Sequence, residues 1–306
     1  MPTYELVISG LAALALFAYG LQSLSREIEE SGGEKLRTLL ARVTESPVRG
    51  YLLGILVTAL IQSSSAVSSF TVALVDAGAV TLHSSLAILL GANVGTTVTA
   101  WLVSFKLAGI GAIFVIIGMI VSMLPWRYAA VGRSIFYFGL ILFALDLVGY
   151  ALKPLRDNPA VQSLVAVAKT PVLGVLIGTV LTAFIQSSSV VVGLGVLFAN
   201  QGILPPAAVV PIVVGANLGS TVTALLASLG MKTNARRAAI ANVIFNGFGV
   251  LVVLPFLSPI SDYFASTISD PGMAVAWAHL SFNIMVSVLG FAILRPLERL
   301  VTRIVV

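Results

Sequence analysis

The sequence predicts an all-α polytopic membrane protein made of two related halves, and three observations carry this prediction. Of the 306 residues, 58% are apolar and only 9% are charged, against about 25% charged residues in a soluble domain. Several apolar stretches are long enough to cross a bilayer, and two polar motifs occur twice at a fixed spacing. Together these features exclude a water-soluble globular protein.

Composition also excludes other classes of function. The chain has no cysteine and two histidines, His83 and His279, which rules out a disulfide scaffold or a thiolate metal site. The net charge of +5 comes from basic residues in short clusters between apolar stretches. Nucleic-acid binding would need one continuous basic face, so the charge pattern indicates membrane topology and no nucleic-acid partner.

Five segments meet the length of about 20 apolar residues that a spanning helix needs. They are residues 5–24, 108–125, 134–152, 238–257 and 273–294. The first contains Glu5 and lacks a basic leading region, so we expect it to be a permanent helix rather than a signal peptide. Residues 25–46 are charged with an apolar thread, which is typical of a short helix lying at the membrane interface.

The remaining regions, 48–106 and 172–230, are copies of each other. With an offset of 124 residues, GILVTALIQSSSAV at 54–67 aligns with GTVLTAFIQSSSVV at 178–191, and GANVGTTVTAWLVS at 91–104 aligns with GANLGSTVTALLAS at 215–228. Across 54–105 and 178–229, 22 of 52 positions are identical. The chain is therefore a tandem duplication.

We expect three parts. Unit one covers 1–130, with a hairpin at about 48–79 and a broken helix at about 84–106. Unit two covers 131–258, with a hairpin at about 172–203 and a broken helix at about 208–230. Residues 259–306 add a C-terminal transmembrane helix and a cytoplasmic tail.

Lys and Arg positions favour an outside N-terminus and an inside C-terminus. If both QSSS regions are re-entrant hairpins, the protein has about seven full crossings, inverted repeats, and 13 basic residues inside against 4 outside. If they span fully, the repeats are parallel and the division is 15 to 2. Charge bias sets the orientation but does not choose between these models.

The QSSS motifs place four consecutive polar residues deep in the bilayer. Gln62 follows Val48 by 14 residues, about 20 Å along a helix. Such residues are costly in lipid unless they line a cavity or face protein. Back-bonding to their own helix is the ordinary alternative, but retention of the motif in both halves favours a binding site.

The GAN motifs place glycines on both sides of Asn93 and Asn217. Two interpretations compete. The glycines pack closely against a neighbouring helix, as GxxxG motifs do, or they break the helix within the membrane. Beside the polar motif we expect the break, because broken helices offer carbonyls to Na⁺ and N–H groups to anions.

Neither motif region, 54–104 or 178–228, contains a Lys or Arg. A bound anion would be balanced only by half-helix dipoles, each worth about half a charge, and by cations bound beside it. Binding of anion and cation would then be mutually dependent, which is the basis of symport.

Several single polar residues have weaker signals. Asp146 is the one carboxylate deep in a predicted span, and a structural pairing is favoured over an ion role. Asn242 and Asn246 share a helix face, and Phe245-Asn246 recurs as Phe282-Asn283 near His279; interhelical hydrogen bonding is favoured over substrate contact. Asp76 and Asn200 are expected at the hairpin bases, and His83 at the interface.

The doubled QSSS, the doubled GAN-x-G-[ST]-T and the FN-containing helices resemble the type II sodium-dependent phosphate cotransporters. The resemblance covers nearly the whole chain. It implies inverted re-entrant hairpins whose tips meet near the membrane midplane and bind Na⁺ and phosphate, which selects the model with seven crossings. It also implies an elevator-like transport domain, often in a dimer. Many bacterial members append a PhoU-like domain; the sequence stops at Val306, so we expect no regulation by such a domain.

We therefore expect a sodium-coupled importer of inorganic phosphate in the cytoplasmic membrane with no enzymatic activity, and the resemblance implies a homodimer. The alternatives are a symporter of another oxyanion such as sulfate or arsenate, an ion channel and, least favoured, an intramembrane hydrolase. The expected phosphate ligands are Ser63, Ser64, Ser187 and Ser188. The expected sodium ligands are Gln62, Ser65, Asn93, Thr96, Thr97, Gln186, Ser189, Asn217, Ser220 and Thr221.

Overall fold

The computed structural model describes residues 3–41, 46–105, 109–152 and 170–306, and all its regular elements in these ranges are helices. In chain order they are α1 (Thr3–Ala41), α2 (Pro47–Ile61), α3 (Ser64–Asp76), α4 (Leu82–Ser104), α5 (Gly111–Ser122), α6 (Trp126–Leu152), α8 (Pro171–Ile185), α9 (Ser188–Asn200), α10 (Pro206–Ala227), α11 (Thr233–Val253), the 3₁₀ turn η2 (Leu254–Phe256), α12 (Leu257–Thr267), α13 (Pro271–Ala292) and α14 (Leu294–Ile304).

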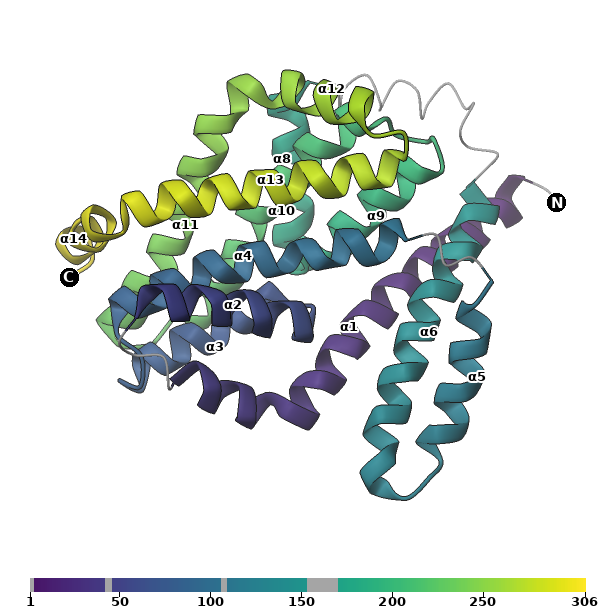
Figure 1. Ribbon diagram of the computed structural model, residues 1–306, viewed down its shortest axis with the longest axis horizontal. Helices are drawn as coiled ribbons and strands as arrows, with labels where there is room; N and C mark the ends of the chain where they lie inside the picture. The colour runs from purple at the N-terminus through teal and green to yellow at the C-terminus, as the bar shows by residue number, and fades with distance from the viewer. Residues whose placement is uncertain (1–2, 42–45, 106–108, 153–169) are drawn as a thin grey trace.

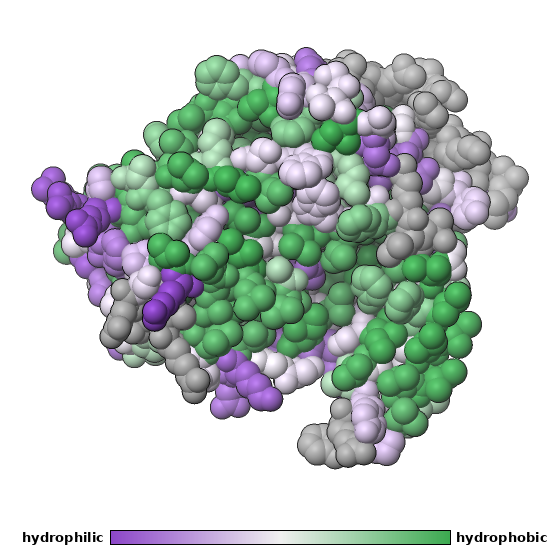
Figure 2. Space-filling view, in the orientation of Figure 1, coloured by the Kyte–Doolittle hydropathy of each residue, from purple (hydrophilic) through white to green (hydrophobic). Residues whose placement is uncertain are grey.

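Six of these helical stretches are long and apolar enough to cross a membrane. They are Ile8–Ala41, Leu82–Ser104, Tyr128–Ala151, Pro206–Ala227, Thr233–Thr267 and Pro271–Ala292. Figure 2 shows the broad apolar surface that these helices and their neighbours present. The prediction of an all-α polytopic membrane protein is confirmed.

Two predicted segments differ from the structure. In the predicted span 108–125 the helix is shorter than expected: α5 has 12 residues, about 18 Å of helix, and lies antiparallel to α6, with Gly111 against Phe143 and Gly132 against Ser122. The 25–46 region is not a separate helix, because α1 runs unbroken to Ala41. Figure 1 shows the last part of α1 bending away from the rest; the Gly32-Gly33 pair lies in this region, and such pairs favour helix bends. Residues 42–45 and 106–108 lie outside the described residues.

Each QSSS region forms a helical hairpin. Along α2, Gly50 lies against Ser84 and Gly54 against Ile88, so α2 runs parallel to α4 from the same end. Since α3 returns to within five residues of the start of α4, both ends of the hairpin lie at the N-terminal end of α4. α8 and α9 have the same relation to α10, where Gly178 lies against Ile212. The helices of the two hairpins run over 47–76 and 171–200, and the sequence predicted hairpins at about 48–79 and 172–203.

The two hairpins open toward opposite ends of α13. At the start of α13, the Asn200 side chain at the end of α9 accepts a hydrogen bond from Gly272 N, at 3.0 Å. Just beyond the other end of α13, Glu298 of α14 binds His83 at the start of α4, with Nδ1 and Oε2 2.8 Å apart. This arrangement is the one that inverted repeats require.

The GAN helices are not broken, which contradicts the prediction for 84–106 and 208–230. α4 and α10 are continuous through both motifs. Their glycines instead allow close helix packing: a Cβ on Gly91 would lie 2.0 Å from Tyr51 O, and one on Gly215 would lie 2.0 Å from Val175 O. The GxxxG packing interpretation is correct.

A second repeat, with an offset of 37 residues, covers about the last quarter of the chain. Leu257–Thr267 (α12) aligns with Leu294–Ile304 (α14), and the same offset aligns Phe245-Asn246 in α11 with Phe282-Asn283 in α13. The predicted tail after the last span therefore contains a helix, α14, and α12 is the corresponding helix in the other copy of this repeat.

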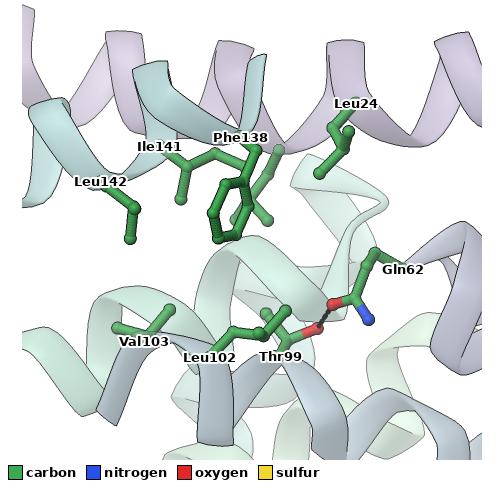
Figure 3. A pocket seen from close by; sticks show the side chains of 9 residues that line it. Leu24, Gln62, Thr99, Leu102, Val103, Phe138, Ile141 and Leu142 are labelled. Carbon is green, nitrogen blue, oxygen red and sulfur yellow. Dashed lines mark hydrogen bonds between the residues drawn. The ribbon is translucent and has the colours of Figure 1, made fainter. Parts of the chain in front are cut away.

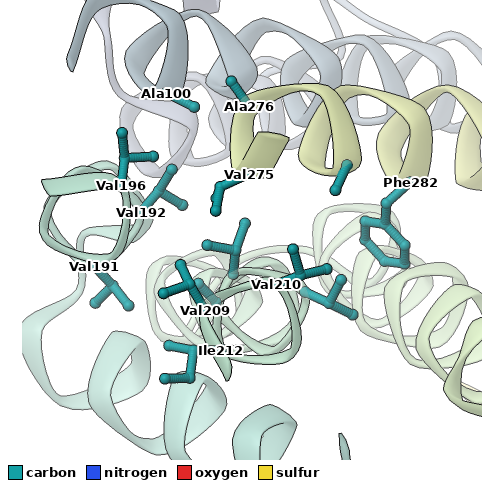
Figure 4. Packing of buried hydrophobic residues seen from close by; sticks show 14 of the residues in the cluster. Ala100, Val191, Val192, Val196, Val209, Val210, Ile212, Val275, Ala276 and Phe282 are labelled. Carbon is teal, nitrogen blue, oxygen red and sulfur yellow. The ribbon is translucent and has the colours of Figure 1, made fainter. Parts of the chain in front are cut away.

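The centre of the protein is filled by small β-branched and alanine side chains. Figure 4 shows valines of α9 and α10 packing against Val275 and Ala276 of α13 and Ala100 of α4. α1 and α6 pack together beside this core, and α5 packs along α6 (Figure 1). A bidentate ion pair joins α1 to α6, with Arg133 donating to both carboxylate oxygens of Glu27 at 2.7 Å.

Candidate functional site

The helix breaks occur at the glutamines of the two QSSS motifs. Gln62 and Gln186 adopt left-handed backbone conformations with φ of 59° and 58°, and they are the only such non-glycine residues in the described part of the chain. Each donates its N–H to the carbonyl four residues earlier, Gln62 to Thr58 O at 2.8 Å and Gln186 to Thr182 O at 2.7 Å. This αL cap ends the first arm of each hairpin.

The next serine of each motif starts the second arm. The Ser63 side chain accepts a hydrogen bond from Ala66 N at 3.2 Å, and the Ser187 side chain accepts one from Val190 N at 3.4 Å. Serine is a preferred N-cap for this reason. The N–H groups of the first helical residues have no acceptor within their own helix, so Ser64, Ser65 and their mates present unpaired donors at the tip.

The two tips meet, although 124 residues separate them. Ser65 Oγ donates to Gln186 O at 3.2 Å, and Ser189 Oγ donates to Gln62 O at 2.9 Å. The Ser64 and Ser188 hydroxyl oxygens lie 3.3 Å apart. The exchange is reciprocal, as expected for two copies related by an approximate two-fold axis, and it brings the two QSSS motifs into one site.

Thr99 belongs to this site, although the expected ligands do not include it. Its hydroxyl donates to Gln62 Oε1 at 2.9 Å, and its oxygen lies 3.3 Å from Ser189 Oγ. The corresponding threonine of the second half, Thr223, has a buried hydroxyl with no hydrogen-bond partner. The alignment of the halves pairs these two threonines and is the signal that could have identified them.

The two tips differ in exposure. Gln62 is 6% exposed, and Figure 3 shows Leu24 of α1 and Phe138 and Ile141 of α6 on the side of a small cavity facing Gln62 and Thr99. Gln186 is exposed. The first tip is therefore covered by α1 and α6, while the second is open.

Unlike Thr99, the four hydroxyl residues of the GAN motifs themselves do not donate to the tips. The four hydroxyls bond carbonyls of their own helices: Thr96 to Ala92 O, Thr97 to Val94 O, Ser220 to Asn217 O and Thr221 to Leu218 O. This back-bonding is ordinary for such residues in membrane helices.

The asparagines form two matched buried networks. Asn93 donates to Asn246 Oδ1 at 2.8 Å. The amide of Asn246 in turn donates to Asn242 O and Oδ1, one turn earlier in the same helix. In the other half, Asn217 donates to Asn283 Oδ1, and Asn283 donates to His279 O.

His279 takes the place of Asn242 in the second network. Its Nε2 lies 3.3 Å from Asn217 Oδ1, while its Nδ1 is buried without a partner. The networks join the helices of the two internal repeats, in accord with the expected interhelical role.

The remaining candidates have structural contacts. Asp146 accepts a hydrogen bond from Gly109 N at 3.0 Å, just before α5. Asp76 at the end of α3 accepts one from Lys232 N at 2.6 Å. These contacts tie chain segments together at the ends of helices.

Comparison with known proteins identifies the family. The model of the Na⁺/Pi-cotransporter family matches residues 16–150 and 147–259. The chain belongs to the Na⁺/Pi-cotransporter family, whose members are transporters and not enzymes.

Three relatives illustrate how much of each protein the similarity covers. The "Uncharacterized protein YqeW" of Bacillus subtilis is 30% identical over 299 residues, 97% of each chain. The "Putative inorganic phosphate export protein YjbB" of Salmonella typhimurium is 32% identical over 278 residues, 90% of this chain and 51% of that protein. The mouse "Sodium-dependent phosphate transport protein 2A" is 38% identical over 101 residues, 32% of this chain and 16% of that protein.

The chain thus spans nearly all of the first relative but about half of the second. No solved structure matches it.

Proposed function

We propose that this protein couples the movement of inorganic phosphate across the cytoplasmic membrane to Na⁺, with the two hairpins re-entering the bilayer from opposite sides. The observation that carries the proposal is the meeting of the QSSS tips through Ser65, Ser189 and the glutamine carbonyls. Hairpin arms of 15 and 13 residues, about 22 and 20 Å long, are too short to cross a hydrocarbon core of about 30 Å.

Phosphate fits the N-terminal ends of α3 and α9. Both ends point into the contact between the tips, and each contributes unpaired N–H groups and the positive end of a helix dipole. The hydroxyls of Ser63, Ser64, Ser187 and Ser188 lie at the same ends and can donate to phosphate oxygens. With no Lys or Arg in either motif region, hydrogen bonds and dipoles are the means of holding the anion.

Na⁺ fits the C-terminal ends of α2 and α8, where carbonyls and side-chain oxygens gather. Hard neutral oxygens are suitable ligands for Na⁺. Gln62, Ser65, Gln186 and Ser189 supply them at the tips, and the unpartnered hydroxyl of Thr223 is a further candidate.

We also keep the GAN residues among the proposed sodium ligands, after the residues at the tips. They are Asn93, Thr96, Thr97, Asn217, Ser220 and Thr221. A hydroxyl that donates its hydrogen to a carbonyl keeps oxygen lone pairs for a cation.

The unequal tips fit alternating access. α1 and α6 cover the Gln62 tip and leave the Gln186 tip exposed. Because the halves are related by approximate symmetry, the reverse arrangement is available if the hairpin unit moves against α1 and α6. We propose this movement as the elevator-like step; assembly into a homodimer remains a prediction from the family resemblance.

The gradients set the direction of transport. A symporter is reversible, so an inward Na⁺ gradient drives import and a reversed gradient drives export. The relatives named for sodium-dependent phosphate transport and for phosphate export are both compatible with such a cycle. We propose import under an inward Na⁺ gradient.

Proteoliposomes test the proposal directly. Vesicles containing the full chain and no internal Na⁺ should accumulate labelled phosphate when Na⁺ is added outside, and excess sulfate should not compete. Gln62→Ala and Gln186→Ala should each abolish uptake while the protein stays folded. Uptake that K⁺ or a proton gradient drives equally well would refute sodium coupling. If sulfate or arsenate prevented the uptake of labelled phosphate and unlabelled phosphate did not, the substrate would be another oxyanion.

A further inference from the structure

The surface of α14 has three stripes that follow the helical repeat. One stripe is buried against the protein: Leu294, Leu297 and Val301. A second stripe is basic and exposed: Arg295, Arg299 and Arg303. A third is apolar and exposed, with Leu300 at 45% and Ile304 at 57% exposure. A solvent-facing helix would not need the third stripe.

The position of α14 is fixed by the span before it. α13 has 22 residues, about 33 Å of helix, so its end lies at the membrane surface if it spans. α14 begins two residues later, and Figure 1 shows it turned across the end of α13 and drawn nearly end-on. α14 therefore lies along the membrane surface at the headgroup level.

Contacts with other elements hold α14 in place. Glu298 binds His83 of α4, and Arg237 of α11 donates to Val305 O at 3.0 Å and to Thr302 O at 3.2 Å. Its exposed stripes consequently keep one orientation relative to the bilayer.

The basic stripe has no acidic partner within the described residues. Glu298, the only carboxylate side chain on α14, is occupied by His83. Arg236 and Arg237 lie at the same end, where they donate to Val306 O and Val305 O. Figure 2 shows hydrophilic residues gathered at the end of the molecule where α14 lies.

We propose that α14 is a binding site for the headgroups of anionic phospholipids in one leaflet. Arginine binds phosphate oxygens in a bidentate geometry, and an apolar stripe beside a basic one is the pattern of helices that lie at the interface of anionic membranes. Leu300 and Ile304 enter the acyl boundary while the arginines hold the phosphates.

The repeat supplies a matched control. α12 is the mate of α14 and also has exposed apolar side chains, with Tyr263 at 62% exposure. It carries Asp262 and no Lys or Arg, so it should show no preference for anionic lipid.

The test uses the absence of native cysteine. Leu300→Cys and Tyr263→Cys carry an environment-sensitive fluorophore in the full chain, reconstituted with spin-labelled phosphatidylglycerol or phosphatidylcholine at equal fractions. Quenching at position 300 should show an enrichment of the anionic lipid of about fivefold for each arginine engaged, falling as salt is added. The label at position 263 should be quenched equally by both lipids.

Charge variants separate the lipid contact from folding. R295Q/R299Q/R303Q should remove the preference at position 300, while the corresponding triple Lys variant should retain it. Equal quenching by both lipids of the label at position 300, in the protein that keeps all three arginines, would overturn the proposal. So would loss of the preference in inorganic phosphate, but not in chloride of the same ionic strength, because the site would then belong to a free anion. Neither result depends on whether the protein transports phosphate.

Discussion

Replacement of Gly215 by alanine distinguishes a packing glycine from a flexible one by the sign of the stability change. A Cβ at this position would lie 2.0 Å from Val175 O, a backbone atom of α8. Close contacts between carbon and a carbonyl oxygen begin at about 3.3 Å, so α8 would have to move away by roughly 1.3 Å. Overpacking of this kind costs about 1–3 kcal/mol.

The displaced arm ends at Gln186, so the substitution should also disturb the tip. We expect Gly215→Ala to lower the midpoint of thermal unfolding in detergent by several degrees and to reduce phosphate uptake. Gly91→Ala should do the same, because its Cβ would lie 2.0 Å from Tyr51 O.

Gly247 is the matched control. It lies within α11, and its nearest neighbour to an added Cβ is Leu218 Cδ1 at 3.9 Å. Gly247→Ala should leave stability unchanged or raise it by up to about 1 kcal/mol, the difference in helix propensity. If Gly215→Ala instead raised the unfolding midpoint as this control does, while abolishing uptake, the glycine would be a hinge and the packing argument would be wrong.

Three further predictions concern single side chains. Gln186→Gly should keep the unfolding midpoint, because glycine accepts the φ of 58° without strain, while sodium-dependent uptake is lost; a large drop in the midpoint would contradict this. Arg133→Gln should destabilise the protein by about 1–3 kcal/mol in chemical denaturation, because Glu27 has a side chain only 7% exposed, and Arg133→Lys should recover part of the loss; equal stability of all three proteins would refute it. His279→Leu should cost about 1–3 kcal/mol by leaving Asn217 Oδ1 unpaired, and His279→Asn should restore most of it, whereas equal loss in both variants would show that the hydrogen bond is not the cause.

Charge and apolar length predicted the class of the fold, because the cost of polar groups in lipid acts on every residue in the same way. The internal alignment predicted that the two halves adopt the same local structure, since copies of one sequence adopt one local structure. The bounds of α2 and α3 are indeed offset by 124 residues from those of α8 and α9. The same reasoning failed for the GAN motifs. A glycine pair supports either a break or a close helix contact, and only the position of Tyr51 and Val175 decides between them.

Some features of the site could also be predicted from the sequence, and others could not. The doubled QSSS motif could be recognised because four polar residues in an apolar stretch require a partner. Thr99 recurs as Thr223 in the alignment of the halves, but its role at the tip became evident only from its contact with Gln62, as an isolated threonine in an apolar helix more often bonds its own backbone. The 37-residue repeat was visible at Phe245-Asn246 and Phe282-Asn283, but its full extent depended on seeing that α12 and α14 are equivalent helices.

The sequence by itself determined that this is a multi-pass helical membrane protein with a duplicated polar motif and no basic residue near it, because composition and repetition do not depend on how the chain folds. Only the tertiary structure decided that the helices break at Gln62 and Gln186, that the two tips exchange hydrogen bonds, and that one tip is covered by α1 and α6 while the other is exposed. The contact between the tips and the covering of one tip depend on residues far apart in the chain, and packing geometry rather than local preference fixes such contacts.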